Sequence, residues 1–79
     1  MELDKILNLI AEILNVSAED ISLSTHFYED LGADSLDLYQ IFTGMEEEFG
    51  VTLSGKNMPK VETVEDLTEL ISRGEKHDH

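Results

Sequence analysis

Residues 30–37 of this chain read Asp-Leu-Gly-Ala-Asp-Ser-Leu-Asp, and they mark the point at which a loop becomes a helix. Gly32 permits a tight turn, and an apolar helical pattern begins directly after Ser35. Aspartates on both sides surround the Ser35 hydroxyl with negative charge. The stretch therefore predicts a single serine presented at the start of a helix.

The helix that follows is predicted to run from about Ser35 to Phe49, with Gly50 as a left-handed stop. Its apolar residues occupy more than one stripe, which is typical of a central helix that contacts neighbours on two sides. These residues are Leu36, Leu38, Tyr39, Ile41, Phe42, Met45 and Phe49.

An earlier helix is predicted to end at about Asn15, because its apolar residues recur at three- and four-residue spacing. They are Leu3, Ile6, Leu7, Ile10, Ile13 and Leu14. Residues 16–34 then form a long connection, and residues 17–20 within it can close a local turn. A loop of this length in a small domain is usually functional or well anchored. Its expected apolar anchors are Ile21, Leu23, Phe27 and Leu31.

The last helix is predicted to begin after Thr63 and to stop at Gly74. Thr63 and Asp66 have the spacing of a capping box, with Asp in place of the usual Glu. The residues that this helix is expected to bury are Val64, Leu67, Leu70 and Ile71.

Residues 51–62 contain Gly55 and Pro59, which leave room for only one short helical turn. The chain is therefore predicted to be all-α. We expect one domain over residues 1–79, with a frayed tail over residues 73–79. Its architecture would be a small bundle of three main helices plus one short helix, with the long loop between the first and second helices.

The 79 residues include 18 acidic and 5 basic side chains, for a formal net charge of −13. This charge argues against nucleic-acid and anionic-membrane binding and favours partners with basic docking patches. The chain has no cysteine, so any thiol chemistry must come from an added group. No apolar run is long enough to span a membrane, and the N-terminus lacks a basic secretion signal. We therefore expect a cytoplasmic protein, as a monomer.

The motif, the composition and the segment lengths on both sides of Ser35 resemble the acyl carrier protein family. The resemblance implies that Ser35 receives a 4′-phosphopantetheine arm from coenzyme A through a phosphopantetheinyl transferase. The arm's thiol would carry acyl groups as thioesters, for fatty-acid or related polyketide or specialised lipid biosynthesis. The chain would itself be non-catalytic, presenting substrates to acyl transferases, ketosynthases and other acyl-processing enzymes.

The same resemblance implies which residues meet those enzymes. Asp34 matches an aspartate that helps the transferase hold its metal ion, and Leu36 contributes an exposed apolar patch. The alternative reading of Asp34 is that it simply favours the helix N-terminus. The full expected docking set is Asp34, Leu36, Asp37, Gln40, Glu46 and Glu47.

Two departures from the family pattern concern partner choice. Tyr39 and Gln40 stand where members commonly carry a small aliphatic residue and a glutamate. Lys56 and Lys60 lie in a segment that is usually acidic. We therefore expect at least one partner to differ from those of a standard fatty-acid carrier.

An acyl chain needs an apolar cavity, which we expect between the second helix and its neighbours. The alternative interpretation, which the sequence favours for each candidate taken alone, is that these residues are ordinary core. They are Phe27, Ile41, Met45, Leu53, Val61 and Leu67.

Two other functions remain open from the sequence. A peptidyl or aminoacyl carrier would use the same serine, but it usually has a second glycine where Ala33 and Asp34 stand. A non-carrier acidic interaction module would use Ser35 only as a helix N-cap. Residues 30–37 lack the ligand spacing of an EF-hand, so we expect no metal site there. No Ser-His-Asp spacing suggests an enzyme, and residues 77–79 (His-Asp-His) are given no role.

Overall fold

The computed structural model describes residues 3–53 and 60–74. Within these ranges the chain is all-α, and its only strand-like feature is an isolated antiparallel bridge between His26 and Thr63. The elements are helices α1 (Leu3–Leu14), α2 (Ser35–Phe49) and α3 (Val64–Gly74) and the 3-10 turn η1 (Ala18–Asp20). The three main helices and the turn at residues 17–20 confirm the predicted helical bundle. The short helical turn predicted within residues 51–62 falls largely on residues 54–59, outside the described residues.

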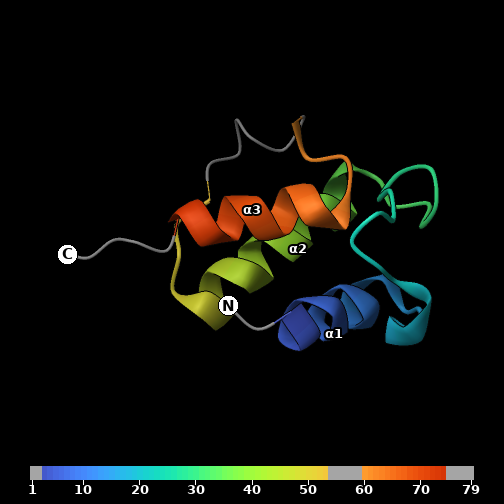
Figure 1. The fold of residues 1–79 in the computed structure, drawn as a ribbon, viewed down its shortest axis with the longest axis horizontal. Helices are drawn as coiled ribbons and strands as arrows, with labels where there is room; N and C mark the ends of the chain where they lie inside the picture. Colours follow the sequence, from blue (N-terminus) through green and yellow to red (C-terminus); the bar gives the residue numbers. More distant parts are fainter. Residues whose placement is uncertain (1–2, 54–59, 75–79) are drawn as a thin grey trace.

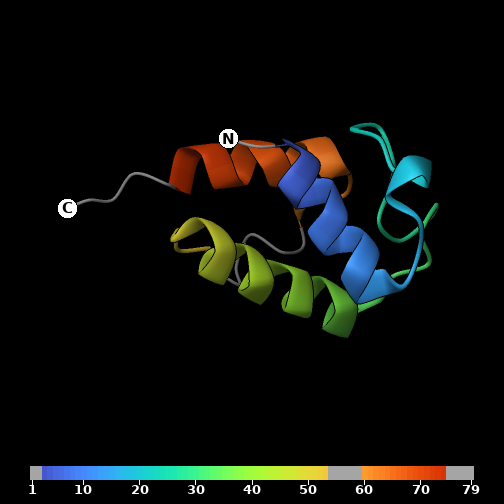
Figure 2. The ribbon, with the colours of Figure 1, turned by 90° about the horizontal axis from the view of Figure 1, so that it is seen from below.

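Helices α2 and α3 run in the same direction, and α1 runs the opposite way, inclined across them (Figures 1 and 2). The end of α1 and the beginnings of α2 and α3 therefore gather at one end of the bundle (right in Figure 1). The long α1–α2 loop covers this end, which is also where Ser35 begins α2.

The helix ends follow from local chemistry. Asn15, directly after α1, has φ +59°, and Gly50, directly after α2, has φ +66°. Both lie in the left-handed conformation that commonly ends a helix. At the start of α3, Thr63 Oγ1 accepts a hydrogen bond from the Asp66 N–H at 3.2 Å. Asp66 Oδ2 accepts in return from the Thr63 N–H at 3.1 Å, so the predicted capping box is confirmed.

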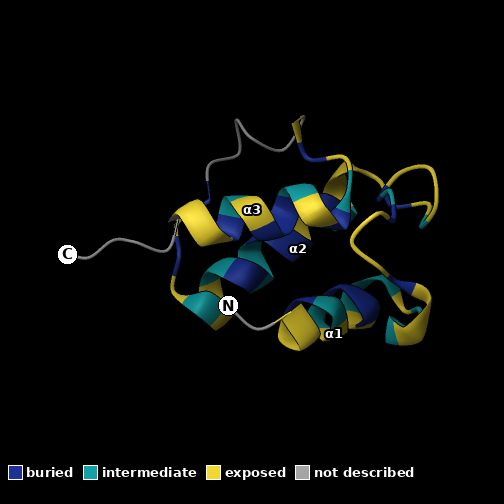
Figure 3. Cartoon of the chain, in the orientation of Figure 1, coloured by how far each residue is buried: buried dark blue, intermediate teal, exposed yellow. Residues whose placement is uncertain are grey.

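The core lies where the three helices face one another, as the buried residues in Figure 3 show. Its fully buried side chains come from α1, α2, α3 and the long loop, namely Ile6, Ile10, Leu38, Ile41, Met45, Val64, Leu67 and Phe27. Two of the apolar residues named above for α2 do not pack against its neighbours: Leu36 is 70% exposed, as the family resemblance implied, and Tyr39 is 60% exposed. The buried residues Leu38, Ile41 and Met45 already form one core-facing stripe, which leaves Leu36 and Tyr39 facing solvent.

The long loop is tied to the start of α3 through its backbone. The first N–H groups of a helix have no partner within the helix. Here the Val64 N–H donates to the Thr25 carbonyl at 3.0 Å, and the Glu65 N–H donates to the Leu23 carbonyl at 2.9 Å. Loop carbonyls therefore complete the beginning of α3.

The predicted side-chain anchors of the loop hold in part. Ile21 and Phe27 are buried, and Leu31 is half-buried against the core. Leu23 is 41% exposed, so its prediction as an apolar anchor is wrong. Its backbone carbonyl, rather than its side chain, makes the contact with α3.

Candidate functional site

The start of α2 is held by two aspartates. Asp34 is the N-cap residue, and its Oδ1 accepts a hydrogen bond from the Asp37 N–H at 2.9 Å. Asp37 Oδ2 accepts in return from the Asp34 N–H at 3.2 Å, which completes a capping box. The Asp34 carboxylate thus stabilises the helix end directly, as the sequence allowed.

Ser35 is the first helical residue and is exposed. The interpretation of Ser35 as the N-cap is wrong, because Asp34 supplies the capping oxygen. Among the described residues, the Ser35 hydroxyl has no hydrogen-bond partner. The helix therefore does not use this hydroxyl to hold its end.

A compact turn delivers the chain to Asp34. The His26 carbonyl accepts from the Asp30 N–H at 3.0 Å, and the Phe27 carbonyl accepts from the Ala33 N–H at 2.9 Å. Gly32 has φ +68°, with nothing within 4 Å of an added Cβ. Its backbone conformation, rather than lack of space, favours glycine there. With Phe27 fully buried, this turn fixes the start of α2 to the core.

The electrostatics of this end can accommodate an attached phosphate. Free N–H groups and the positive end of the helix dipole lie at the start of α2, where they favour a negatively charged phosphodiester. The described residues hold no cluster of three or more His, Asp or Glu side chains able to bind a metal ion.

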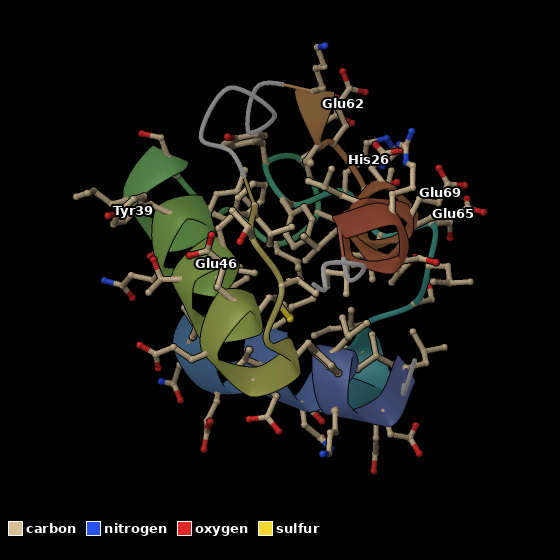
Figure 4. All side chains as sticks on the ribbon, turned by 90° about the vertical axis from the view of Figure 1, so that its left-hand side faces the viewer. His26, Tyr39, Glu46, Glu62, Glu65 and Glu69 are labelled. Atoms are coloured by element: carbon tan, nitrogen blue, oxygen red, sulfur yellow. The ribbon has the colours of Figure 1, made fainter. Side chains whose placement is uncertain are left out.

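The outer face of α2 carries the other expected contact residues. Leu36, Gln40 and Glu47 are exposed, and helical spacing places them along one stripe. Tyr39 lies beside this stripe and projects away from the bundle (Figure 4). We call Leu36, Tyr39, Gln40 and Glu47 the α2 outer face.

Glu46 differs from the other expected docking residues. It is half-buried, and its Oε2 accepts a hydrogen bond from the Leu53 N–H at 2.7 Å. Glu47, the next residue, is exposed. Sequence reasoning treated these two glutamates as equivalent and missed the bond to Leu53.

All six residues expected to line an acyl cavity are 8% exposed or less. Of three surface hollows bordered by described residues, only one touches the set, at Val61. The largest, about 620 Å³, is an open groove along α1 that includes Lys5, Leu9 and Glu48. The six candidates therefore pack as core here, and none of these three hollows is the expected cavity.

The comparisons with known proteins agree with this geometry. A family model described as the phosphopantetheine attachment site matches residues 4–71. An acyl carrier protein of Nitratidesulfovibrio vulgaris (strain DP4) is 42% identical over 69 residues, covering 87% of this chain and 91% of that protein. This chain belongs to the acyl carrier protein family. The non-carrier interaction module is thereby excluded.

Solved structures show the same fold for this acyl carrier protein. The apo doublet acyl carrier protein from prodigiosin biosynthesis matches with a TM-score of 0.77 and 23% identity over 89% of this chain. The present chain spans only 34% of that doublet. A chain in the structure of the ishigamide ketosynthase/chain length factor matches with a TM-score of 0.73 and 28% identity, covering 91% of this chain and 90% of that one.

Membership of the family establishes the general role of this acyl carrier protein. Its cofactor is 4′-phosphopantetheine, and it carries acyl groups. Among the helices in the described ranges, none has the length and apolar character needed to cross a membrane.

Proposed function

We propose that Ser35 is the attachment point of 4′-phosphopantetheine and that the chain acts as a non-catalytic carrier. The observation that carries this proposal is that Asp34, and not Ser35, caps the start of α2. Asp34 caps the helix, which leaves the exposed Ser35 hydroxyl uncommitted on a rigid element. A hydroxyl placed in this way can react without disturbing the fold and can hold an attached arm at one fixed point.

The residues around Ser35 suit this attachment. Loading forms a bond between Ser35 Oγ and the pyrophosphate phosphorus of coenzyme A that bears pantetheine. The bond from that phosphorus to the bridging oxygen of the pyrophosphate breaks, the nucleotide part leaves with its own phosphates, and the hydroxyl proton passes to a base of the transferase. The free N–H groups at the start of α2 favour the resulting phosphodiester, and Asp34 is the proposed aid to metal binding by the transferase. When attached, the arm supplies a thiol that holds the acyl group as a thioester.

The α2 outer face is the proposed docking surface for partner enzymes, together with the acids Asp34 and Asp37. Leu36 offers an exposed apolar contact next to Ser35, and Glu47 offers an exposed charge farther along the helix. Basic patches on the transferase, acyl transferases and ketosynthases would complement this acidic surface. Docking raises the effective concentration of the thioester at each active site.

Partner choice is proposed to depend on the departures at Tyr39, Gln40 and Lys60, which are all exposed. Lys56 lies outside the described residues. Gln40→Glu together with Lys56→Glu should improve turnover with a housekeeping malonyl transferase and ketosynthase. Full activity of the parent with those enzymes would contradict a specialised partner set.

The proposed acyl pocket is the buried set Phe27, Ile41, Met45, Leu53, Val61 and Leu67. Because these side chains now pack together, an acyl chain would have to displace some of them. Met45→Phe should leave less room for a medium-length acyl chain among these side chains, and so reduce the protection of that chain from solvent. Unchanged protection would remove Met45 from the pocket.

We also propose a single-domain monomer over residues 1–79, acting in the cytoplasm. The net charge of −13 opposes self-association.

The decisive experiment is intact mass after incubation with coenzyme A, magnesium and a broad-specificity phosphopantetheinyl transferase. The parent should gain one phosphopantetheine, and Ser35→Ala should gain none. No gain by folded, unmodified parent would overturn the assignment of Ser35. Offering acyl and aminoacyl cargo to the loaded protein then separates an acyl carrier from a peptidyl or aminoacyl carrier.

A further inference from the structure

We propose that Glu46 is a positioning residue that holds the segment after α2 over the acyl-binding core, rather than a docking contact. This inference rests on the carrier function proposed above. In this role Glu46 limits the access of solvent to an acyl chain bound in the core.

The bond that carries the proposal is short and spans seven residues. Glu46 Oε2 accepts from the Leu53 N–H at 2.7 Å in a part-buried position, the geometry of a strong charge-assisted hydrogen bond. The Glu46 carbonyl also accepts from the Gly50 N–H at 2.9 Å. Glu46 therefore bonds both to the C-cap of α2, through its carbonyl, and to the chain that leaves the helix, through its carboxylate.

The segment held in this way is part of the core. Val51 is 5% exposed and Leu53 is 8% exposed, while Thr52 between them faces solvent. This alternation places two apolar side chains of an extended segment against the bundle. Leu53 is also one of the six proposed pocket residues, so the Glu46 carboxylate holds a wall of that pocket in place.

The neighbouring glutamates show that this role is specific to Glu46. Glu48 Oε2 lies 3.4 Å from Lys5 Nζ and so connects α2 to α1. Glu47 is exposed, and within the described part of the chain it makes no ion pair. Figure 4 shows Glu46 on the side of α2 next to the segment that follows the helix. Of the three, Glu47 alone has a side chain left fully available to a partner.

The proposal predicts that loss of the Glu46 carboxylate loosens Leu53 and exposes the cargo. An acyl chain that reaches the core should then become more accessible to solvent reagents. A two-carbon acyl group is too short to reach the core and should be unaffected.

The first measurement is amide hydrogen exchange at Leu53 by NMR in the full chain, with Met45 as a reference for global stability. Glu46→Ala should raise Leu53 exchange by about tenfold or more relative to Met45, the size expected for a lost charge-assisted bond. Glu46→Gln keeps an acceptor and should give a smaller rise, and Glu47→Gln is the matched control. An unchanged Leu53 rate in Glu46→Ala, or an equal rise in the control, would overturn the proposal.

The second measurement is hydroxylamine cleavage of octanoyl and acetyl thioesters on the loaded protein. Glu46→Ala should speed octanoyl cleavage several-fold and leave acetyl cleavage unchanged. Faster Leu53 exchange without faster octanoyl cleavage would overturn the link to cargo. Because the exchange measurement needs no loading, failure of the carrier function is distinguishable from failure of this inference. If Glu46→Ala does not fold, both comparisons are made with Glu46→Gln.

Discussion

Adjacent residues of one type serve different purposes when a helix turns them toward different surroundings. Glu46, Glu47 and Glu48 follow one another in α2, each rotated by roughly 100° from the last. Glu46 binds a backbone N–H, Glu47 faces solvent, and Glu48 pairs with Lys5. The Lys5–Glu48 pair is about half exposed, so it contributes no more than about 1 kcal/mol. Asp34 and Ser35 also differ in role although they are adjacent: Asp34 caps α2, and the Ser35 hydroxyl takes no part in the cap.

Asp34 is expected to have two separable roles. Asp34→Ala removes the capping oxygen and should lower the free energy of unfolding by about 1 kcal/mol. Asp34→Asn keeps an acceptor and should change stability little, yet it should slow phosphopantetheine loading because the carboxylate charge is gone. Urea denaturation and loading rates measured side by side test this. Loading of Asp34→Asn at the parent rate would show that Asp34 is only a cap.

Asp66 should make part of the stability depend on pH. Hydrogen bonds from the Glu62 and Thr63 N–H groups hold the pKa of the Asp66 carboxyl below its usual value. A lowered folded-state pKa contributes stability that is complete above the ordinary aspartate pKa, roughly 4, and is lost as the pH falls through the folded value. The parent should therefore exceed Asp66→Asn in stability at pH 7, with the difference disappearing in acid. A difference that stays constant down to pH 3 would contradict this account.

At the scale of the element, one glycine lies inside α2 and another directly follows it, in opposite situations. Gly50 follows the helix in the left-handed conformation, at φ +66°. Gly44 lies inside the helix, where an added Cβ would come 3.0 Å from Leu9 Cδ2 of α1. The first glycine ends the helix, and the second lies at the close approach of α1 and α2.

The same substitution should therefore have opposite effects at these two glycines. Gly50→Ala should cost about 1 kcal/mol, because a side chain disfavours the left-handed conformation. Gly44→Ala should be neutral or stabilising by up to about 1 kcal/mol, since alanine favours a helix interior and the end of the Leu9 side chain can shift. Thermal unfolding of both variants tests this prediction. An equal loss of stability in Gly50→Ala and Gly44→Ala would contradict it.

At the scale of the whole molecule, the charge of −13 is confined to a fold with a radius of gyration of 11.5 Å. At about 10 mM salt the screening length is roughly 30 Å, so acids on opposite faces repel one another. At about 0.1 M salt it falls to roughly 10 Å. Salt, and especially millimolar magnesium, should therefore raise the melting temperature. A melting temperature that is the same in low salt and in millimolar magnesium would count against this repulsion.

The bounds of the helices and the place of Ser35 were predictable from the sequence because their signals are local. Apolar spacing marks α1, the Thr63–Asp66 capping box starts α3, and Gly50 ends α2. The Asp34–Asp37 capping box has the same spacing as that of α3, so it was recognisable in principle. A cap, a turn or a helical stripe depends on residues within about four positions of one another.

Only the tertiary structure decided which side chains remained free. Leu23 is exposed, and its backbone carbonyl rather than its side chain connects the long loop to α3. The exposure of Leu36 and Tyr39 follows from which side of α2 meets the other helices. The Glu46 carboxylate bonds to the Leu53 N–H because the segment after α2 folds back onto the core. Each outcome depends on segments that come together only when the bundle forms. Local sequence patterns do not predict which distant segments will be in contact.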